Sequence, residues 1–226
     1  MTTTTATTAT KEAAATTGWS REQIARRAAQ DIPAGAYVNL GIGLPTRVGD
    51  LIPAGREVFL HSENGILHLG PRPPAGAENP DLINASKQPV TLRAGAAIFD
   101  SALSFAVMRG GHLDLAILGA YEVAANGDLA NWTRGDPGTP PAVGGAMELA
   151  YGAREVWVLM EHTTRDGRPR LLRRCSLPLT ARGVVGRIYT DLAVLRVTSA
   201  GLHVEAMAEG MTLARLQALT EAPLLA

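Results

Sequence analysis

The chain has 226 residues and equal numbers of basic and acidic side chains, 21 of each, so its formal net charge is zero. No basic stripe or acidic tail occurs, no apolar stretch reaches the roughly 18 residues that would span a bilayer, and Cys175 is the single cysteine. These features argue against a nucleic acid or a membrane as partner and against a disulfide scaffold, and they predict a cytoplasmic globular protein.

The first 18 residues are rich in Thr and Ala and are predicted to form a disordered tail, with one domain over residues 19–226. Ser20 and Gln23 form a capping box for a first helix, which Pro33 ends. Further helices are predicted after residue 46 and at residues 101–108, 144–151 and 212–219, with Ser101 as the cap of the 101–108 helix. Apolar runs predict strands at residues 36–40, 57–60, 90–92, 96–99, 113–119, 155–160, 194–197 and 202–206.

Three turn signals in the second half of the chain predict β-hairpins: Asn126-Gly127, Asp166-Gly167 and Ser199-Ala200-Gly201. Residues 72–88 are rich in Pro, Gly and Asn and predict irregular surface. Strands that alternate with helices, together with these hairpins, predict an α/β fold. We expect a mixed, largely parallel sheet covered by helices on both faces, with added β-hairpins.

Glu63 follows the strand pattern at 57–60, inside the stretch HSENGILHLGP at 61–71. Open α/β sheets place their chemistry in the crevice outside the carboxyl ends of their strands. A carboxylate between a Ser and an Asn-Gly turn is also open to a large ligand. From these residues alone, either a reactive carboxylate or a solvated loop acid accounts for Glu63.

Eight segments of the chain together form a recognisable pattern. They are VNLGIGLPT (38–46), SENGILHLGP (62–71), DLINASKQPVTL (81–92), GGHLDLAILGA (110–120), GDLANW (127–132), GGAMELA (144–150), RCSLPLTARGVV (174–185) and RIYTDLAVLRVT (187–198). In this order, and over about residues 20–223, the chain resembles the B (beta) subunit of the 3-oxoacid CoA-transferases, which include succinyl-CoA:3-oxoacid and 3-oxoadipate CoA-transferases. The resemblance implies the isomerase-like fold of CoA-transferase family I.

The resemblance implies that Glu63, the Glu of SENG, is the catalytic nucleophile. Attack of this carboxylate on an acyl-CoA would give an acyl-glutamyl anhydride and then a glutamyl-CoA thioester, with ping-pong kinetics. A carboxylate needs no general base for this attack. Coenzyme A is then a substrate and a covalent intermediate, and no permanently bound cofactor is expected. The five histidines show no metal-ligand spacing with a third ligand, so no metal site is predicted.

The resemblance also assigns roles to residues around the nucleophile. Asn39 matches an Asn whose amide holds the thioester oxyanion, although an Asn there also suits a turn. Lys87 matches a Lys that contacts CoA, with a solvated loop Lys as the alternative. Gly41 and Gly43 would let backbone approach CoA, or they would simply permit a tight strand-to-helix turn.

Gly144 and Gly145 begin the GGAM segment, which in the family borders the thioester site. The alternative is a helix N-terminus packed tightly on the sheet. Three departures from the family pattern are expected to affect the choice of acid: His61 stands in place of Gln, His68 in place of Gly, and residues 138–143 in place of a Lys-containing stretch.

Family members of this size work with a separate A (alpha) subunit. We therefore expect a hetero-oligomer, α2β2, with an active site at the subunit interface and with an acyl-CoA and a 3-oxo acid as substrates. The segment at 97–102 resembles the 3-oxoadipate enzymes more than the acetoacetate enzymes. Three alternatives stay open: an acetoacetate CoA-transferase subunit, a non-catalytic assembly subunit, and a sugar-phosphate isomerase-like protein, for which Arg47 is the one cation near the 41–46 turn.

Overall fold

The computed structural model describes residues 18–135, 138 and 142–226 of the chain. The predicted tail lies outside these residues apart from Gly18. Within the described part of the chain, no helix is both long and apolar enough to cross a membrane.

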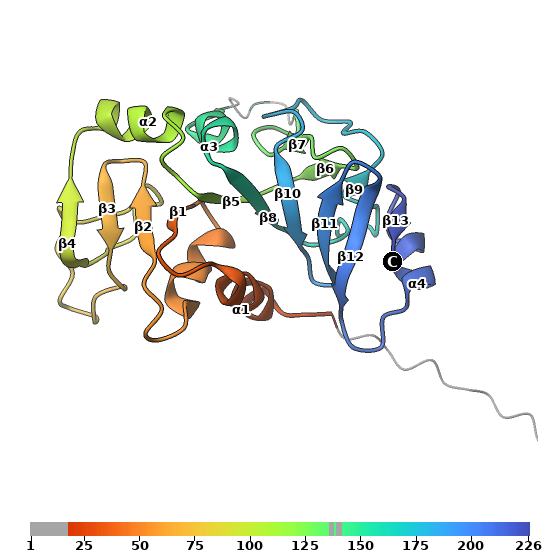
Figure 1. Ribbon diagram of the computed structural model, residues 1–226, viewed down its shortest axis with the longest axis horizontal. Helices are drawn as coiled ribbons and strands as arrows, with labels where there is room; N and C mark the ends of the chain where they lie inside the picture. Colours follow the sequence, from red (N-terminus) through yellow and green to blue (C-terminus); the bar gives the residue numbers. More distant parts are fainter. Residues whose placement is uncertain (1–17, 136–137, 139–141) are drawn as a thin grey trace, which may run out of the picture.

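The described strands form a ten-stranded sheet with the order β13-β12-β11-β10-β8-β5-β1-β2-β3-β4, and a three-stranded sheet with the order β7-β6-β9 (Figure 1). Their bounds are β1 Tyr37–Leu40, β2 Phe59–Ser62, β3 Ile66–Leu69, β4 Leu92–Ile98, β5 Leu115–Gly119, β6 Glu122–Ala124, β7 Leu129–Ala130, β8 Glu155–Leu159, β9 Leu171–Leu172, β10 Val185–Tyr189, β11 Ala193–Thr198, β12 Gly201–Met207 and β13 Leu224–Leu225. The central strands β10, β8, β5, β1 and β2 are parallel, and antiparallel pairs flank them on both sides. The predicted mixed, largely parallel sheet is therefore confirmed.

The helices are α1 Arg21–Asp31, the 3₁₀ helix η1 Pro45–Leu51, α2 Ser101–Arg109, α3 Ala146–Gly152 and α4 Leu213–Ala218. The predicted capping box begins α1: Ser20 Oγ accepts from Gln23 N at 3.2 Å, and Gln23 Oε1 accepts from Ser20 N at 2.7 Å. The predicted cap of α2 was wrong by one residue. Asp100, rather than Ser101, accepts from Leu103 N at 2.8 Å, because a carboxylate is an equally good cap.

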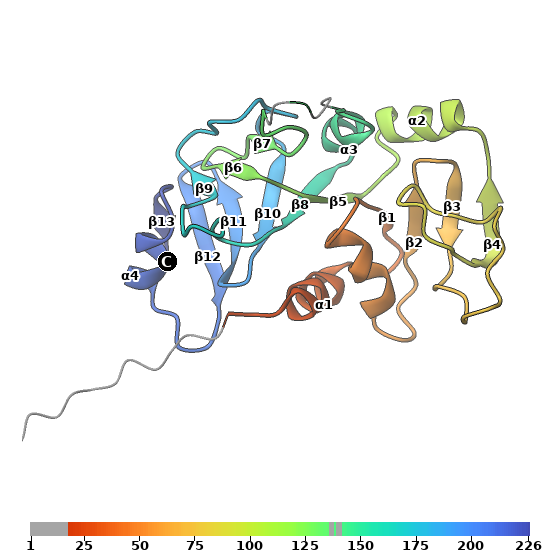
Figure 2. The ribbon, with the colours of Figure 1, turned by 180° about the vertical axis from the view of Figure 1, so that it is seen from behind.

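Alternating residues of the central strands build two cores on the two faces of the large sheet. In β5, Ala116 and Leu118 pack with α2, α3 and the small sheet, whereas Leu115 and Ile117 pack with α1 and η1. Successive side chains of a strand point to opposite faces, which explains this division. Figures 1 and 2 show α2 and α3 together on one side of the strands and α1 on the other, so the predicted cover on both faces is confirmed.

Some strands differ from the pattern in the sequence. The runs at 90–92 and 96–99 belong to one strand, β4, which passes through Gly95 with a positive φ of 80°. Sequence patterns missed β3, β10 and β13, of which β3 pairs with β2 and β4 directly after Glu63. Of the predicted hairpins, Asn126-Gly127 joins β6 to β7, the 199–201 turn joins β11 to β12, and Asp166-Gly167 closes a loop with one isolated bridge between Thr163 and Pro169.

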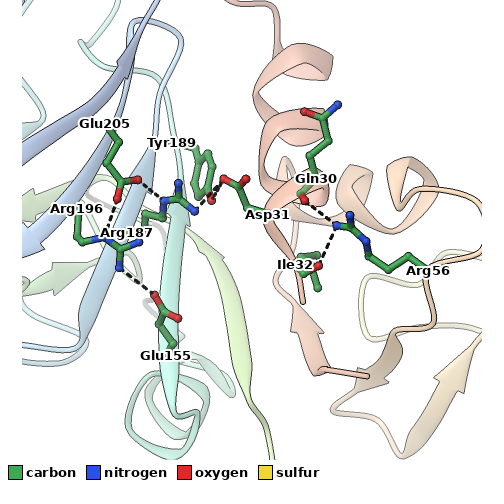
Figure 3. Close-up of polar contacts among 9 residues, drawn as sticks. All are labelled: Gln30, Asp31, Ile32, Arg56, Glu155, Arg187, Tyr189, Arg196 and Glu205. Atoms are coloured by element: carbon green, nitrogen blue, oxygen red, sulfur yellow. Dashed lines mark hydrogen bonds and ion pairs between the residues drawn. The ribbon is translucent and has the colours of Figure 1, made fainter. Parts of the chain in front are cut away.

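Polar contacts fasten the C-terminal end of α1 to the sheet (Figure 3). Arg187 of β10 lies between Asp31, at 2.8 Å, and Glu205 of β12, at 2.6 Å, and Tyr189 donates to Asp31 at 2.8 Å. Arg187 is 17% exposed, so water screens these ion pairs less than it screens surface pairs. On the other side of α1, Arg56 donates to the carbonyl oxygens of Gln30 and Ile32, which a helix end leaves without partners.

Candidate active site

Glu63 lies in the three-residue loop between β2 and β3, at the carboxyl end of β2. Ser62 and Ile66 are the last paired residues on either side of this loop. Gly65 N donates to Ser62 O at 2.9 Å and closes the turn. The short loop holds the backbone of Glu63 between two strands of the sheet, which is the position predicted from the sequence, and the side chain is half-buried.

Gly65 makes this loop possible. Its φ is +108°, a region that residues with a side chain rarely occupy, and a Cβ built on it would lie 1.9 Å from Phe99 O. Gly65 O also accepts from Phe99 N at 2.9 Å. The loop therefore packs directly on the backbone between β4 and α2, and no other residue fits at this position.

The structure brings Asn39 to Glu63. Asn39 is the third residue of β1, and its amide Nδ2 donates to Glu63 Oε2 at 3.2 Å. The same nitrogen lies 3.3 Å from His61 O. Asn39 is fully buried, and its Oδ1 accepts no hydrogen bond from any described residue. The contacts of Nδ2 therefore fix the orientation of the amide, with an N–H directed at the carboxylate of Glu63.

His61 extends this contact into the protein interior. Its Nδ1 lies 3.1 Å from Asn39 Nδ2, and its Nε2 lies 3.0 Å from the Oγ of Ser104 on α2. Burial lowers the pKa of His61 to about 4, so the ring is neutral at pH 7. Because Asn39 Nδ2 is a donor, Nδ1 is the acceptor and Nε2 carries the proton that it donates to Ser104. Sequence reasoning identified His61 only as a departure and missed Ser104, which no local pattern marks.

The predicted GGAM segment also lies beside Glu63. Gly145 precedes α3, and a Cβ built on it would lie 3.8 Å from Glu63 Cγ and 3.5 Å from the Phe105 ring. Gly144 has a φ of +57° with no atom within 4 Å of its Cβ position. The predicted departure at 138–143 includes residues 139–141, which lie outside the described residues.

Two hydrogen bonds attach the loop that carries Lys87 to the Glu63 turn. Ser62 Oγ accepts from Ala85 N at 2.9 Å, and Asn64 Nδ2 donates to Ile83 O at 2.7 Å. Lys87 is exposed at a turn in this loop, with a φ of +60°. The DLINASK and SENG segments, far apart in the sequence, are therefore in contact, although no hydrogen bond joins Lys87 to Glu63 within the described residues.

The two glycines after β1 differ in their surroundings. A Cβ on Gly41 would lie 3.1 Å from Leu118 Cδ2 and 3.2 Å from Ile117 O, so close packing on β5 alone explains this glycine. Gly43 has a φ of +91° and no atom within 4 Å of its Cβ position, and it borders a cavity of about 570 Å³. Gly43 therefore has room for a ligand beside it, whereas Gly41 does not.

His68 occupies a backbone conformation that glycine prefers. Its φ is +67°, which costs a residue with a side chain about 1 kcal/mol. The ring packs on Phe59 at a centroid distance of 4.7 Å, and Phe59 in turn stacks on Tyr37 at 4.8 Å. A glycine, which the resemblance places at this position, would adopt the same conformation without that cost.

The cysteine thiol is not ionised, and no metal cluster occurs among the described residues. Burial, together with the charges of Glu122 and Asp128, raises the pKa of the Cys175 thiol to about 12, so Cys175 is protonated at pH 7. No group of three or more His, Cys, Asp or Glu side chains in the described part of the chain could hold a metal ion.

Sequence comparison places the chain among known proteins. The profile of the coenzyme A transferase family matches residues 21–218. The chain is 53% identical over 206 residues to the B subunit of the 3-oxoadipate CoA-transferase of Acinetobacter baylyi, covering 91% of this chain and 95% of that protein. It is 48% identical over 204 residues to the B subunit of the probable succinyl-CoA:3-ketoacid coenzyme A transferase of Bacillus subtilis, covering 90% and 94%.

Structural comparison supports the fold. The acyl-CoA transferase YdiF of Escherichia coli superposes with a TM-score of 0.70 at 21% sequence identity, over 89% of this chain. The chain spans 40% of the length of that enzyme. The predicted CoA-transferase fold is therefore confirmed.

Replacing Gly65 with Ala tests the Glu63 loop. A Cβ 1.9 Å from Phe99 O forces the backbone apart, so we expect Gly65→Ala to lower the free energy of unfolding by about 3 kcal/mol. Gly76 is the matched control, because its φ is +83° but no atom lies within 4 Å of its Cβ position. Gly76→Ala should cost about 1 kcal/mol. Urea unfolding measures both, and equal losses would contradict the proposed backbone clash.

Replacing His61 tests whether its buried ring is neutral in the folded chain, through the pH dependence of the free energy of unfolding. In the unfolded chain the pKa of the His61 imidazole is the ordinary 6.5, whereas burial lowers the pKa in the folded chain to about 4. The free energy of unfolding therefore falls as pH falls from 6.5 to 4. His61 contributes about 3 kcal/mol to this loss, which His61→Gln should remove. The exposed His112 serves as control, and His112→Gln should leave the pH dependence of urea unfolding unchanged. A wild-type pH profile in His61→Gln would refute the assignment.

Proposed function

The chain belongs to the coenzyme A transferase family, and from that membership we propose that it is the B subunit of a 3-oxoacid CoA-transferase with Glu63 as nucleophile. The observation that carries the proposal is the hydrogen bond from the buried Asn39 amide to Glu63 Oε2, 3.2 Å long. It joins a carboxylate at a strand end to a fixed donor. A donor in this position stabilises negative charge that develops on the carboxyl group during covalent catalysis.

The reaction proceeds through three covalent intermediates, two anhydrides and one thioester. A Glu63 oxygen attacks the thioester carbonyl of succinyl-CoA, the C–S bond breaks, and a succinyl-glutamyl anhydride and CoA thiolate result. The thiolate attacks the glutamyl carbonyl of the anhydride, which releases succinate and leaves a glutamyl-CoA thioester. The carboxylate of the 3-oxo acid attacks this thioester and forms a new anhydride with release of CoA thiolate. The thiolate then attacks the acyl carbonyl, which gives the new acyl-CoA and regenerates Glu63.

Asn39 acts on the charge that these steps develop. Each attack on the glutamyl carbonyl moves negative charge onto a carboxyl oxygen of Glu63, and the Asn39 N–H already lies against one of them. A donor fixed before the reaction stabilises that charge without reorganising, which is worth about 3 kcal/mol in comparable sites. The contacts of Asn39 with His61 hold the amide in this orientation.

The proposed acid is 3-oxoadipate, with succinyl-CoA as the donor. Identity to the 3-oxoadipate enzyme of Acinetobacter baylyi, 53%, exceeds the 48% identity to the succinyl-CoA:3-ketoacid enzyme of Bacillus subtilis. The acetoacetate alternative differs only in the second substrate. Both fit the same chemistry at Glu63.

The proposed partner is a separate A subunit in an α2β2 assembly. The two relatives are each named as a B subunit, which supports a second kind of chain. Glu63 is half-buried at the carboxyl edge of the sheet, where a partner chain can complete the substrate pocket. A non-catalytic assembly subunit is the alternative that the covalent test excludes.

Mass spectrometry of the covalent intermediate tests the nucleophile. The chain, assembled with its A subunit and mixed with succinyl-CoA, should gain the mass of CoA on a peptide that contains Glu63. Glu63→Gln should abolish the adduct and turnover, because an amide oxygen does not form the anhydride. The exposed Glu209 is the control, and Glu209→Gln should retain both. Active wild-type enzyme without the adduct would refute Glu63 as the nucleophile.

Initial rates test the substrate. At a fixed concentration of succinyl-CoA, we expect kcat/KM for 3-oxoadipate to exceed that for acetoacetate by at least about tenfold. The polar groups of a site that pair with the second carboxylate of 3-oxoadipate have no partner when acetoacetate is bound. Steady-state rates across both acids give the ratio. A preference for acetoacetate would leave the reaction in place and reverse the assignment of the acid.

A further inference from the structure

A cavity of about 570 Å³ lies on the other side of β2 from the Asn39 contact, and none of the steps at Glu63 uses it. Its walls come from η1, from β2, from the segment after β3 and from the loop at 84–90. The volume falls within the range of small-molecule sites, about 300 to 1,000 Å³. The cavity therefore has room for a ligand of cofactor size.

Arginines dominate the charged residues of this cavity. Arg47 comes from η1, Arg72 from the segment after β3 and Arg93 from β4, and Arg56 also contributes to the wall. Arg56 already donates to main-chain carbonyls at the end of α1. Asp50 is the carboxylate among the cavity-lining residues.

The first three arginines are exposed, and none makes an ion pair within the described residues. Elsewhere in the same chain the pattern is different, since Arg187 and Arg196 both bind Glu205 at 2.6 Å. Guanidinium groups around one cavity repel each other unless an anion lies between them. The arrangement is therefore complementary to a ligand with several negative charges.

We propose that this cavity binds the 3′-phospho-ADP end of the CoA substrate, through Arg47, Arg72 and Arg93. This inference rests on the proposed function. CoA carries a diphosphate and a 3′-phosphate, so three guanidinium groups can each face a phosphate. The planar guanidinium fork matches phosphate oxygens in pairs, which makes arginine better suited than lysine to this task.

The cavity extends to the start of the Glu63 loop. Ser62, the residue before Glu63, lines it, and so does Gly43, whose open surroundings leave space for the pantetheine arm. The loop of Asn84, Ala85 and Ser86 forms another wall and carries Lys87 at its end. A CoA molecule with its phosphates at the arginines and its thioester at Glu63 passes this loop, which gives Lys87 its expected contact.

The double variant Arg72→Gln, Arg93→Gln tests the site in the full-length chain assembled with its A subunit. We expect KM for succinyl-CoA to rise by roughly 100-fold, about tenfold for each lost charge-assisted contact, with kcat within about twofold of wild type. The exposed Arg165, outside the cavity lining, is the matched control, and Arg165→Gln should keep the wild-type KM. With succinyl-pantetheine, which lacks the phosphates, the double variant and wild type should react equally.

A direct titration separates this inference from the proposed function. Adenosine 3′,5′-bisphosphate should bind the wild type, compete with succinyl-CoA, and bind the double variant at least about tenfold more weakly. An unchanged KM and unchanged bisphosphate binding in the double variant would overturn the site while Glu63 chemistry stands. Loss of assembly with the A subunit, at unchanged bisphosphate affinity, would also overturn it. Weaker bisphosphate binding without a CoA adduct on wild-type Glu63 would uphold the site and refute the nucleophile.

Discussion

The parallel pairing of β1 with β2, in the register that sets Asn39 beside His61, is the constraint on which the candidate site depends. Because side chains alternate along a strand, this register points the two side chains to the same face, away from Val38 in the core under α1. A slip of one residue would turn Asn39 into that core. Glu63 follows His61 by two positions and so returns to the same face, within reach of the amide.

The two sides of β2 have different chemistry. His61 and Glu63 face α2 and the start of α3, where Ser104 and Gly145 lie. Ser62 faces the other side, where it anchors the loop at 84–90 and borders the arginine-lined cavity. Because successive side chains of β2 point to opposite faces, the residues of the proposed covalent chemistry lie on one face and the proposed phosphate contacts on the other. The loop after β2 keeps the two groups of residues adjacent.

The two histidines of the HSENGILHLGP stretch play unlike parts. His61 is buried, neutral and bonded on both ring nitrogens, so it holds the Asn39 amide in place. His68 holds a left-handed backbone next to β4 and packs on an aromatic pair. His61 connects to Glu63 through the Asn39 amide, and His68 lies in β3, the strand that follows the Glu63 loop.

The α/β fold, the strand end that carries Glu63 and the family follow from the sequence alone, because alternation, capping residues and ordered motifs are local features. The sequence also identified Asn39 and Gly145 as neighbours of Glu63, through the resemblance. Strand order, the short strand β3, the His61–Ser104 contact and the convergence of Arg47, Arg72 and Arg93 came only from the tertiary structure. These features join residues distant in sequence, and their positions follow from packing and strand register, which no local pattern encodes.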